Sequence, residues 1–143
     1  MKTLLILISF LFLRPTCYEQ TTKNMENILM EYEFYSRASY SKILINNQTI
    51  KLYKTREALQ PNFEKHISLV DQEKLSKLFS KINLKKIYTL KDPTQKRFYD
   101  GAAIAILRIK VQKKEYQSTN FDHGNPPNEI KQLVDKINEI AEK

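Results

Sequence analysis

The second half of the chain contains one conceivable catalytic or metal-binding set, Asp92, Asp100, Asp122 and His123. Carboxylates and imidazole can hold zinc or act as acid and base in a hydrolase, but a zinc site needs three or four ligands at fixed geometry. Three separate loops would have to converge to bring these residues together. One hypothesis is therefore a small hydrolase or metal-dependent enzyme that uses Asp100, Asp122 and His123. The simpler interpretation makes both aspartates turn and cap residues, and it favours a protein without a metal.

The remaining catalytic residue types occur without their usual sequence context. No serine lies in a glycine-flanked nucleophile elbow. The chain contains only two glycines, Gly101 and Gly124, so it has no glycine-rich loop for phosphates. We therefore expect a protein that is not an enzyme and that uses no cofactor.

The first residues have the composition of an export signal. Lys2 is followed by eleven uncharged residues, 3–13, a length typical of the apolar region of a signal peptide. A helix that spans a bilayer needs about 20 such residues. Cys17 is the only cysteine, and it stands where a bacterial lipoprotein carries its acylated cysteine. Arg14 and Thr16 depart from the usual lipoprotein cleavage pattern.

Three fates of this segment stay open: acylation at Cys17, which we favour, release as a soluble periplasmic or secreted protein, and retention as an uncleaved anchor. Residues 1–17 are accordingly predicted to be a signal peptide and 18–27 a tether. Residues 28–143 are predicted to form a single domain, exported to the periplasm or the outer membrane.

The charge of the chain indicates the class of its partner. Without Lys2 and Arg14 the chain keeps 22 basic and 16 acidic residues, a net charge of +6. Such a charge would suit nucleic acid, but an exported chain leaves the compartment that holds most of it. An acidic protein is the expected partner, and anionic lipid head groups or cell-wall polymers are alternatives.

Two kinds of side chain are candidates for a binding surface. Five basic residues are the partner-binding candidates, and the first four lie within one arc of a predicted helix: Lys74, Lys77, Lys81, Lys85 and Arg97. The competing interpretation is an ordinary solvated helix face. The chain also has eight tyrosines and no tryptophan, and tyrosine is common both in interfaces and in strands.

The first half of the domain shows strand patterns followed by one helix. Alternating or β-branched runs predict strands, with a short edge strand last: 30–35, 40–45, 49–53 and 66–70. Asp71 is expected to cap a helix whose apolar positions repeat at helical spacing. That helix is predicted to end near residues 84–87.

The second half repeats this order. Residues 102–111 predict a buried interior strand, and 115–121 its partner. After Pro126 and Pro127 an amphipathic stripe predicts the last helix, with Lys136 on its solvent side. The order strands, helix, strands, helix predicts an α+β fold with an antiparallel sheet of about five strands and two helices packed on one face.

This layout resembles small exported bacterial domains of unknown function. The residues that carry the resemblance are Asp71-Gln72-Glu73-Lys74-Leu75, Asp100-Gly101 and Pro126-Pro127-Asn128-Glu129-Ile130. The resemblance covers about residues 28–141. It implies the same fold and no activity.

Three functions follow as hypotheses. The first is a non-catalytic envelope or periplasmic protein-binding module, and one form of it is an immunity or inhibitor protein against an exported toxin or hydrolase. The second is the small hydrolase or metal-dependent enzyme described above. The third is a structural accessory of an envelope complex. We favour the first, because a binding module needs a surface and no catalytic set.

Overall fold

The computed structural model describes residues 27–46 and 48–143, which form one sheet and its covering helices. The predicted signal peptide and Cys17 lie outside the described residues, as does the tether except for Asn27. The elements in chain order are β1 (Ile28–Tyr35), β2 (Tyr40–Asn46), β3 (Thr49–Tyr53), β4 (Phe63–His66), α1 (Leu69–Ser80), η2 (Leu84–Thr89), η3 (Lys96–Tyr99), β5 (Ile104–Val111), β6 (Lys114–Gln117), β7 (Phe121–Asp122) and α2 (Asn128–Glu142).

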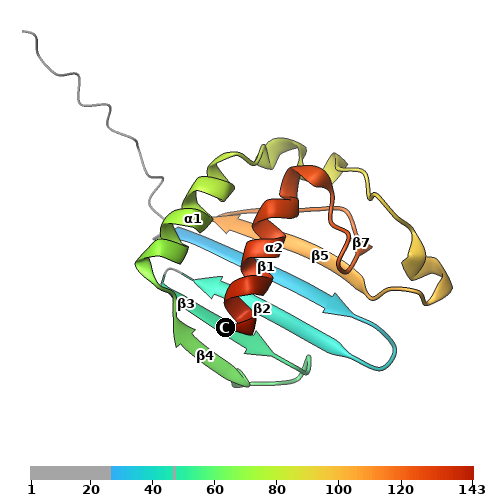
Figure 1. The fold of residues 1–143 in the computed structure, drawn as a ribbon, viewed down its shortest axis with the longest axis horizontal. Helices are drawn as coiled ribbons and strands as arrows, with labels where there is room; N and C mark the ends of the chain where they lie inside the picture. The colour runs from blue at the N-terminus through green and yellow to red at the C-terminus, as the bar shows by residue number, and fades with distance from the viewer. Residues whose placement is uncertain (1–26, 47) are drawn as a thin grey trace, which may run out of the picture.

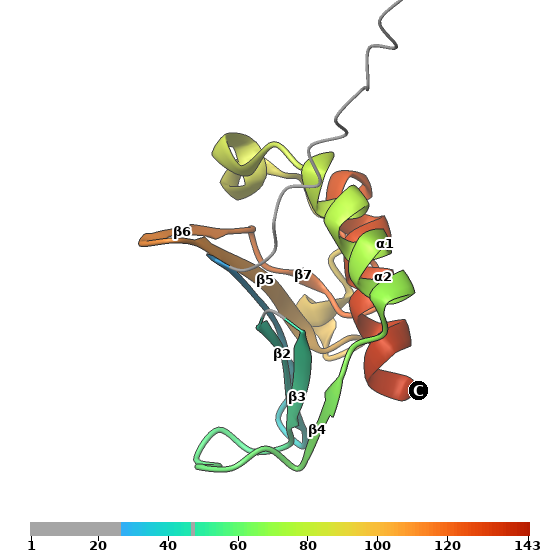
Figure 2. The same ribbon diagram turned by 90° about the vertical axis from the view of Figure 1, so that its left-hand side faces the viewer.

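The sheet is antiparallel throughout and runs in the order β4-β3-β2-β1-β5-β6. The short strand β7 pairs with the first two residues of β5. Both α helices lie on the same face of the sheet (Figures 1 and 2). The predicted α+β class with an antiparallel sheet and two helices is confirmed.

The core lies between the helices and one face of the sheet. Alternate strand residues such as Met30, Tyr32 and Leu107 point to this face and are fully buried. On α2 the predicted stripe, which includes Leu133 and Ile137, is buried against them. Period-two strands and a helix with one apolar face therefore produce the two layers. No helix of the described residues lies over the other face of the sheet, which we call the uncovered face (Figure 2).

The prediction of about five strands is wrong, because the described residues form seven. Residues 115–121 were expected to be one strand, but they divide into β6 and β7 around Ser118. The Ser118 hydroxyl accepts a hydrogen bond from the Leu107 amide at 3.1 Å and donates one to the Thr119 carbonyl at 2.8 Å. A side chain thus takes the place of a backbone partner, and the ladder is interrupted.

The boundaries of the first helix also differ from the prediction. The N-cap is Ser68, whose side chain accepts a hydrogen bond from the Asp71 amide, so Asp71 lies inside the first turn. The expected edge strand at 66–70 is β4, four residues long and ending at His66. The α-helix ends at Ser80, and the shorter 3-10 helix η2 follows it.

Candidate functional site

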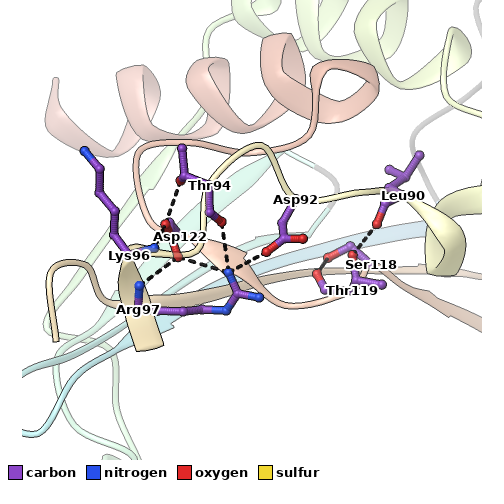
Figure 3. Close-up of polar contacts among 8 residues, drawn as sticks. All are labelled: Leu90, Asp92, Thr94, Lys96, Arg97, Ser118, Thr119 and Asp122. Atoms are coloured by element: carbon purple, nitrogen blue, oxygen red, sulfur yellow. Dashed lines mark hydrogen bonds and ion pairs between the residues drawn. The ribbon is translucent and has the colours of Figure 1, made fainter. Parts of the chain in front are cut away.

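The predicted catalytic set lies in part within a buried polar network beside β7 (Figure 3). The Asp122 side chain has no solvent exposure. Its carboxylate accepts hydrogen bonds from the Thr94 hydroxyl and the Lys96 amide, both at 2.6 Å, and from the amide and guanidinium of Arg97 at 3.1 and 3.0 Å. Burial opposes the ionisation of Asp122, but these donors outweigh it and lower its pKa to about 2. Asp122 is therefore a charged anchor for the loop that precedes η3.

Arg97 occupies the place where a metal would have to sit between Asp92 and Asp122. Its Nη1 atom lies 2.7 Å from Asp92 Oδ2, 3.0 Å from Asp122 Oδ1 and 3.1 Å from the Thr94 carbonyl (Figure 3). A guanidinium nitrogen carries two hydrogens, so only two of these three oxygens can accept a hydrogen bond. The third, Asp92 Oδ2, is buried and has no hydrogen-bond partner in the described part of the chain, so only the ionic contact satisfies it.

Asp100 and His123 lie apart from this network. Asp100 is exposed and faces Arg37 at 3.6 Å. His123 follows Asp122 directly, and its side chain contacts β1 instead: its ring stacks on Phe34 with centroids 3.8 Å apart, and its Nδ1 atom lies 2.8 Å from the Tyr32 hydroxyl.

The Tyr32–His123 pair has a defined protonation state. Burial raises the pKa of the Tyr32 phenol and lowers the pKa of the His123 imidazole, so both are neutral near pH 7. Which of the two groups donates depends on the tautomer of the imidazole. The three residues Asp100, Asp122 and His123 thus do not share a cleft. Within residues 27–46 and 48–143, no group of three or more His, Cys, Asp or Glu side chains could hold a metal ion.

The structure divides the predicted basic residues among different surroundings. Lys74 and Lys77 are exposed on α1, and Lys81 is exposed at its C-cap. Lys85 belongs to η2 and so does not continue the same helix face. Arg97 is turned inward with a side-chain exposure of 10% and is already paired with two carboxylates.

The uncovered face carries tyrosines and charged residues in cross-strand register. Tyr35 of β1 lies opposite Tyr40 of β2, and Lys42 lies opposite Tyr53 of β3. The Lys42 ammonium is 4.8 Å from the centre of the Tyr53 ring. Burial and the Glu33 carboxylate raise the pKa of Tyr40 to about 12, which keeps its hydroxyl a neutral donor. These side chains are held by one another and not by a covering helix.

Charges farther along the same face are paired. Arg108 of β5 contacts Glu31 and Glu33 of β1 at 2.5 and 2.6 Å, and all three side chains are partly exposed. Lys51 and Glu64 form a second pair at 3.2 Å, across β3 and β4. Paired charges of opposite sign leave this part of the face polar but nearly neutral.

The loop between β3 and β4, residues 54–62, closes on itself at its base. The Asn62 amide donates to the Leu52 carbonyl, and the Lys54 amide donates to Asn62 Oδ1, both at 2.8 Å. The Lys54 ammonium also donates to the buried Ser41 hydroxyl at 3.1 Å. These bonds fix where the loop leaves and rejoins the sheet.

The loop projects on the side of the sheet away from the helices (Figure 2). The Arg56 guanidinium lies over the rings of Tyr35 and Tyr40, 4.5 and 5.3 Å from their centres. Leu59 is 94% exposed. We call Tyr35, Tyr40, Tyr53, Arg56 and Leu59 together the tyrosine surface.

A cleft of about 630 Å³ adjoins the tyrosine surface at the β1–β2 turn. Tyr35 and Ile104 form part of its apolar lining, and Arg37 and Asp100 face each other across its rim. Phe98 and Tyr99 of η3, just before this lining, are 66% and 83% exposed. Large apolar side chains and arginines therefore gather at this end of the sheet.

The sequence indicated the tyrosines as candidates for a binding surface but did not single out Tyr35, Tyr40 and Tyr53 as one surface. The pattern that could have revealed it is the alternation of residues along β1 and β2. This alternation places Tyr35 and Tyr40 on the face of the sheet away from the core. The contribution of Arg56 was not foreseeable, because it lies in a loop without periodicity.

Comparison of the chain with protein-family models, curated proteins and solved structures found no match. In the described part of the chain, no helix combines the length and the apolar character needed to cross a bilayer.

Proposed function

We propose that this protein is an exported, non-catalytic binding module of the inhibitor or immunity kind, and that it holds an acidic protein partner on its tyrosine surface. The observation that carries the proposal is the stacking of Arg56 on Tyr35 and Tyr40, which braces an exposed loop against the uncovered face. Loops placed by a rigid sheet are common binding elements.

The composition of the tyrosine surface supports this function. Tyrosine and arginine are the residue types most enriched among residues that dominate binding energy, whereas lysine is depleted in interfaces. This is why we place the partner on the tyrosine surface and not on the lysines of α1. The net charge of +6 for the chain without Lys2 and Arg14 favours an acidic partner, because it accelerates the encounter of opposite charges.

Bracing of the loop supports an inhibitor-like mode of binding. An interface that is already ordered loses less conformational entropy when it binds, so more of the contact energy appears as affinity. Loop 54–62 is closed at its base and clamped by Arg56, and it presents Leu59 to solvent. Insertion of Leu59 into an apolar pocket of the partner would bury a complete leucine side chain.

The proposal is tested by affinity capture from an envelope extract with the exported protein as bait. We expect wild type to retain one acidic protein, and Leu59→Asp to weaken its binding at least about tenfold, since an unpaired charge enters an apolar pocket. Leu69→Asp is the matched control, because Leu69 is 75% exposed on α1 and lies outside the tyrosine surface. Equal binding by the two variants would overturn the assignment of this surface.

A further inference from the structure

The described chain begins beside the turn between β5 and β6. The Asn27 carbonyl accepts a hydrogen bond from the Gln112 amide at 3.0 Å, and Ile28 lies opposite Val111. Residues that precede Asn27 therefore join the domain at this end of the sheet. Loop 54–62 and the β1–β2 turn lie at the other end (Figure 2).

Six exposed lysines gather where the chain joins the domain. We call this region the basic end, and its lysines are Lys81, Lys85 and Lys86 from the end of α1 and η2, and Lys110, Lys113 and Lys114 from β5, the turn and β6. Lys85 of the first group and Lys114 of the second line one groove of about 360 Å³ between η2 and β6.

The lysines of the basic end are not held in ion pairs, although Asp92 and Glu129 line a second groove with Lys81 and Lys86. None of the six lysines has an ion-pair partner within the residues that the structure describes. Glu115, opposite Lys110 in the ladder, is the single acidic residue of the β5–β6 hairpin. Elsewhere on the sheet, Arg108 pairs with Glu31 and Glu33, and Lys51 pairs with Glu64.

An exposed aromatic side chain lies among these lysines. Tyr88 of η2 is 68% exposed and lines the groove together with Leu84, Lys85 and Lys114. Tyrosine has an apolar ring and a polar tip, and it is enriched where proteins meet the head groups of a bilayer.

We propose that the basic end rests on an anionic phospholipid surface. Ammonium groups near such a surface are attracted to its phosphates, and each contributes about 1 kcal/mol at moderate salt. Cys17 and Asn27 are ten residues apart, so the chain between them can span at most about 36 Å when fully extended. An anchor on Cys17 would thus hold the basic end nearest to the bilayer, although the lysine cluster itself does not depend on acylation.

This placement complements the proposed function without resting on it. With the basic end on lipid, the tyrosine surface and loop 54–62 point away from the membrane, where a protein partner can reach them. The two surfaces can therefore fail or succeed independently.

The experiment measures amide hydrogen exchange on the exported protein. The protein is purified from the culture medium if the cells release it, or from the envelope if they retain it. Two samples are compared. One contains the protein with vesicles of phosphatidylcholine alone, and the other contains the protein with vesicles of phosphatidylcholine and phosphatidylglycerol. We expect the amides of η2 and of residues 110–115 to gain protection only with phosphatidylglycerol. Equal protection in both vesicles, or none in either, would overturn the proposal.

Charge reversals locate the contact. Lys85→Glu/Lys113→Glu should lower the added protection at least about tenfold, because two favourable lysines become repulsive. Lys96→Glu/Lys131→Glu changes the net charge equally but lies outside the basic end, and it should alter the protection less than about twofold. Equal loss in both variants would show that net charge alone matters and would sink the site. In a last sample, soluble polyglutamate replaces the vesicles. If it protects the same amides as strongly as phosphatidylglycerol does, the basic end binds an acidic polymer and the lipid proposal is wrong.

Discussion

Asp122 illustrates how a residue with catalytic chemistry can serve the fold. Its carboxylate is buried and accepts four hydrogen bonds, and Arg97 links it to Asp92. No lone pair is directed at a cleft shared with His123 or Asp100. The residue-level evidence therefore favours an anchoring role for this carboxylate.

Asp122→Asn should lower the free energy of unfolding by about 2–4 kcal/mol, because Arg97 loses its fully buried carboxylate partner and an amide group replaces one acceptor oxygen. Urea unfolding measures the change. Asp100→Asn is the control: Asp100 is exposed and has a φ of 56°, which asparagine tolerates, so its effect should stay within about 0.5 kcal/mol. Similar losses in both variants would contradict the anchoring role.

The lowered pKa of Asp122 also predicts an acid transition. A carboxylate whose folded pKa is about 2 contributes stability above its unfolded value near 4, and this stability is lost as the pH falls from about 4 to about 2. Wild type should lose stability more steeply over that interval than Asp122→Asn does. Parallel curves would show that other carboxylates dominate acid unfolding.

His123 gives a second pH dependence at a higher range. Burial lowers the pKa of its imidazole, so the unfolded chain takes up a proton first as the pH falls. Stability is complete above the unfolded pKa of about 6.5 and declines below it. His123→Gln should remove this decline, and its stability should vary less than that of wild type between pH 7 and 5. An unchanged slope would mean that the ring protonates without breaking its bond to Tyr32.

At the scale of single elements, Lys136 shows that an amphipathic pattern does not predict the burial of a charged residue on the polar side of a helix. The pattern places it on the solvent side of α2, and that prediction is wrong: its side chain is 6% exposed and contacts Asp71 of α1 at 2.6 Å. The hydrogen bond from Lys136, then the one from Ser68, lower the pKa of Asp71 to about 2. The pair joins the two helices.

Removing one member of this pair should destabilise the protein more than removing both. Lys136→Met leaves Asp71 with Ser68 and the more distant Lys143 at 3.7 Å, and should cost about 2–4 kcal/mol. Lys136→Met/Asp71→Asn should recover part of that loss. Lys131→Met breaks an exposed pair and should change stability by less than about 1 kcal/mol. A double variant as unstable as the sum of its single variants would show that the pair is not coupled.

The sequence predicted which helices and strands form better than it predicted the residues at which they begin and end. β3 and the buried stripe of α2 were read correctly because each follows the periodicity of its own segment. The division at Ser118 and the burial of Lys136 depend on partners 11 and 65 residues away. The periodicity of a single segment cannot predict such long-range contacts.

At the scale of the whole molecule, the candidate surfaces combine segments far apart in the chain. The tyrosine surface joins β1, β2, β3 and a loop, and the basic end joins η2 to the β5–β6 hairpin. The tyrosines and lysines are visible in the sequence as residue types, but only the folded arrangement places Arg56 over Tyr35 and Lys114 beside η2. The result is a domain with two differently composed ends.

Membrane attachment of the whole protein should depend on two signals, an acyl chain on Cys17 and the basic end. One acyl chain alone binds a bilayer only marginally, and a basic patch adds to it. Labelled palmitate should enter wild type and not Cys17→Ala. High salt should release the basic end, because screening shortens the Debye length to about 3 Å at 1 M.

The combined measurement follows palmitate label, vesicle association and amide protection in one preparation with phosphatidylglycerol. At 1 M salt we expect η2 and the β5–β6 hairpin to lose their added protection and part of the labelled protein to leave the vesicles, since the lysine contact is ionic and the remaining acyl chain binds only marginally. Palmitate in neither protein, or equally in both, would remove acylation at Cys17. Protection that persists at 1 M salt would show that the basic end is not held by charge.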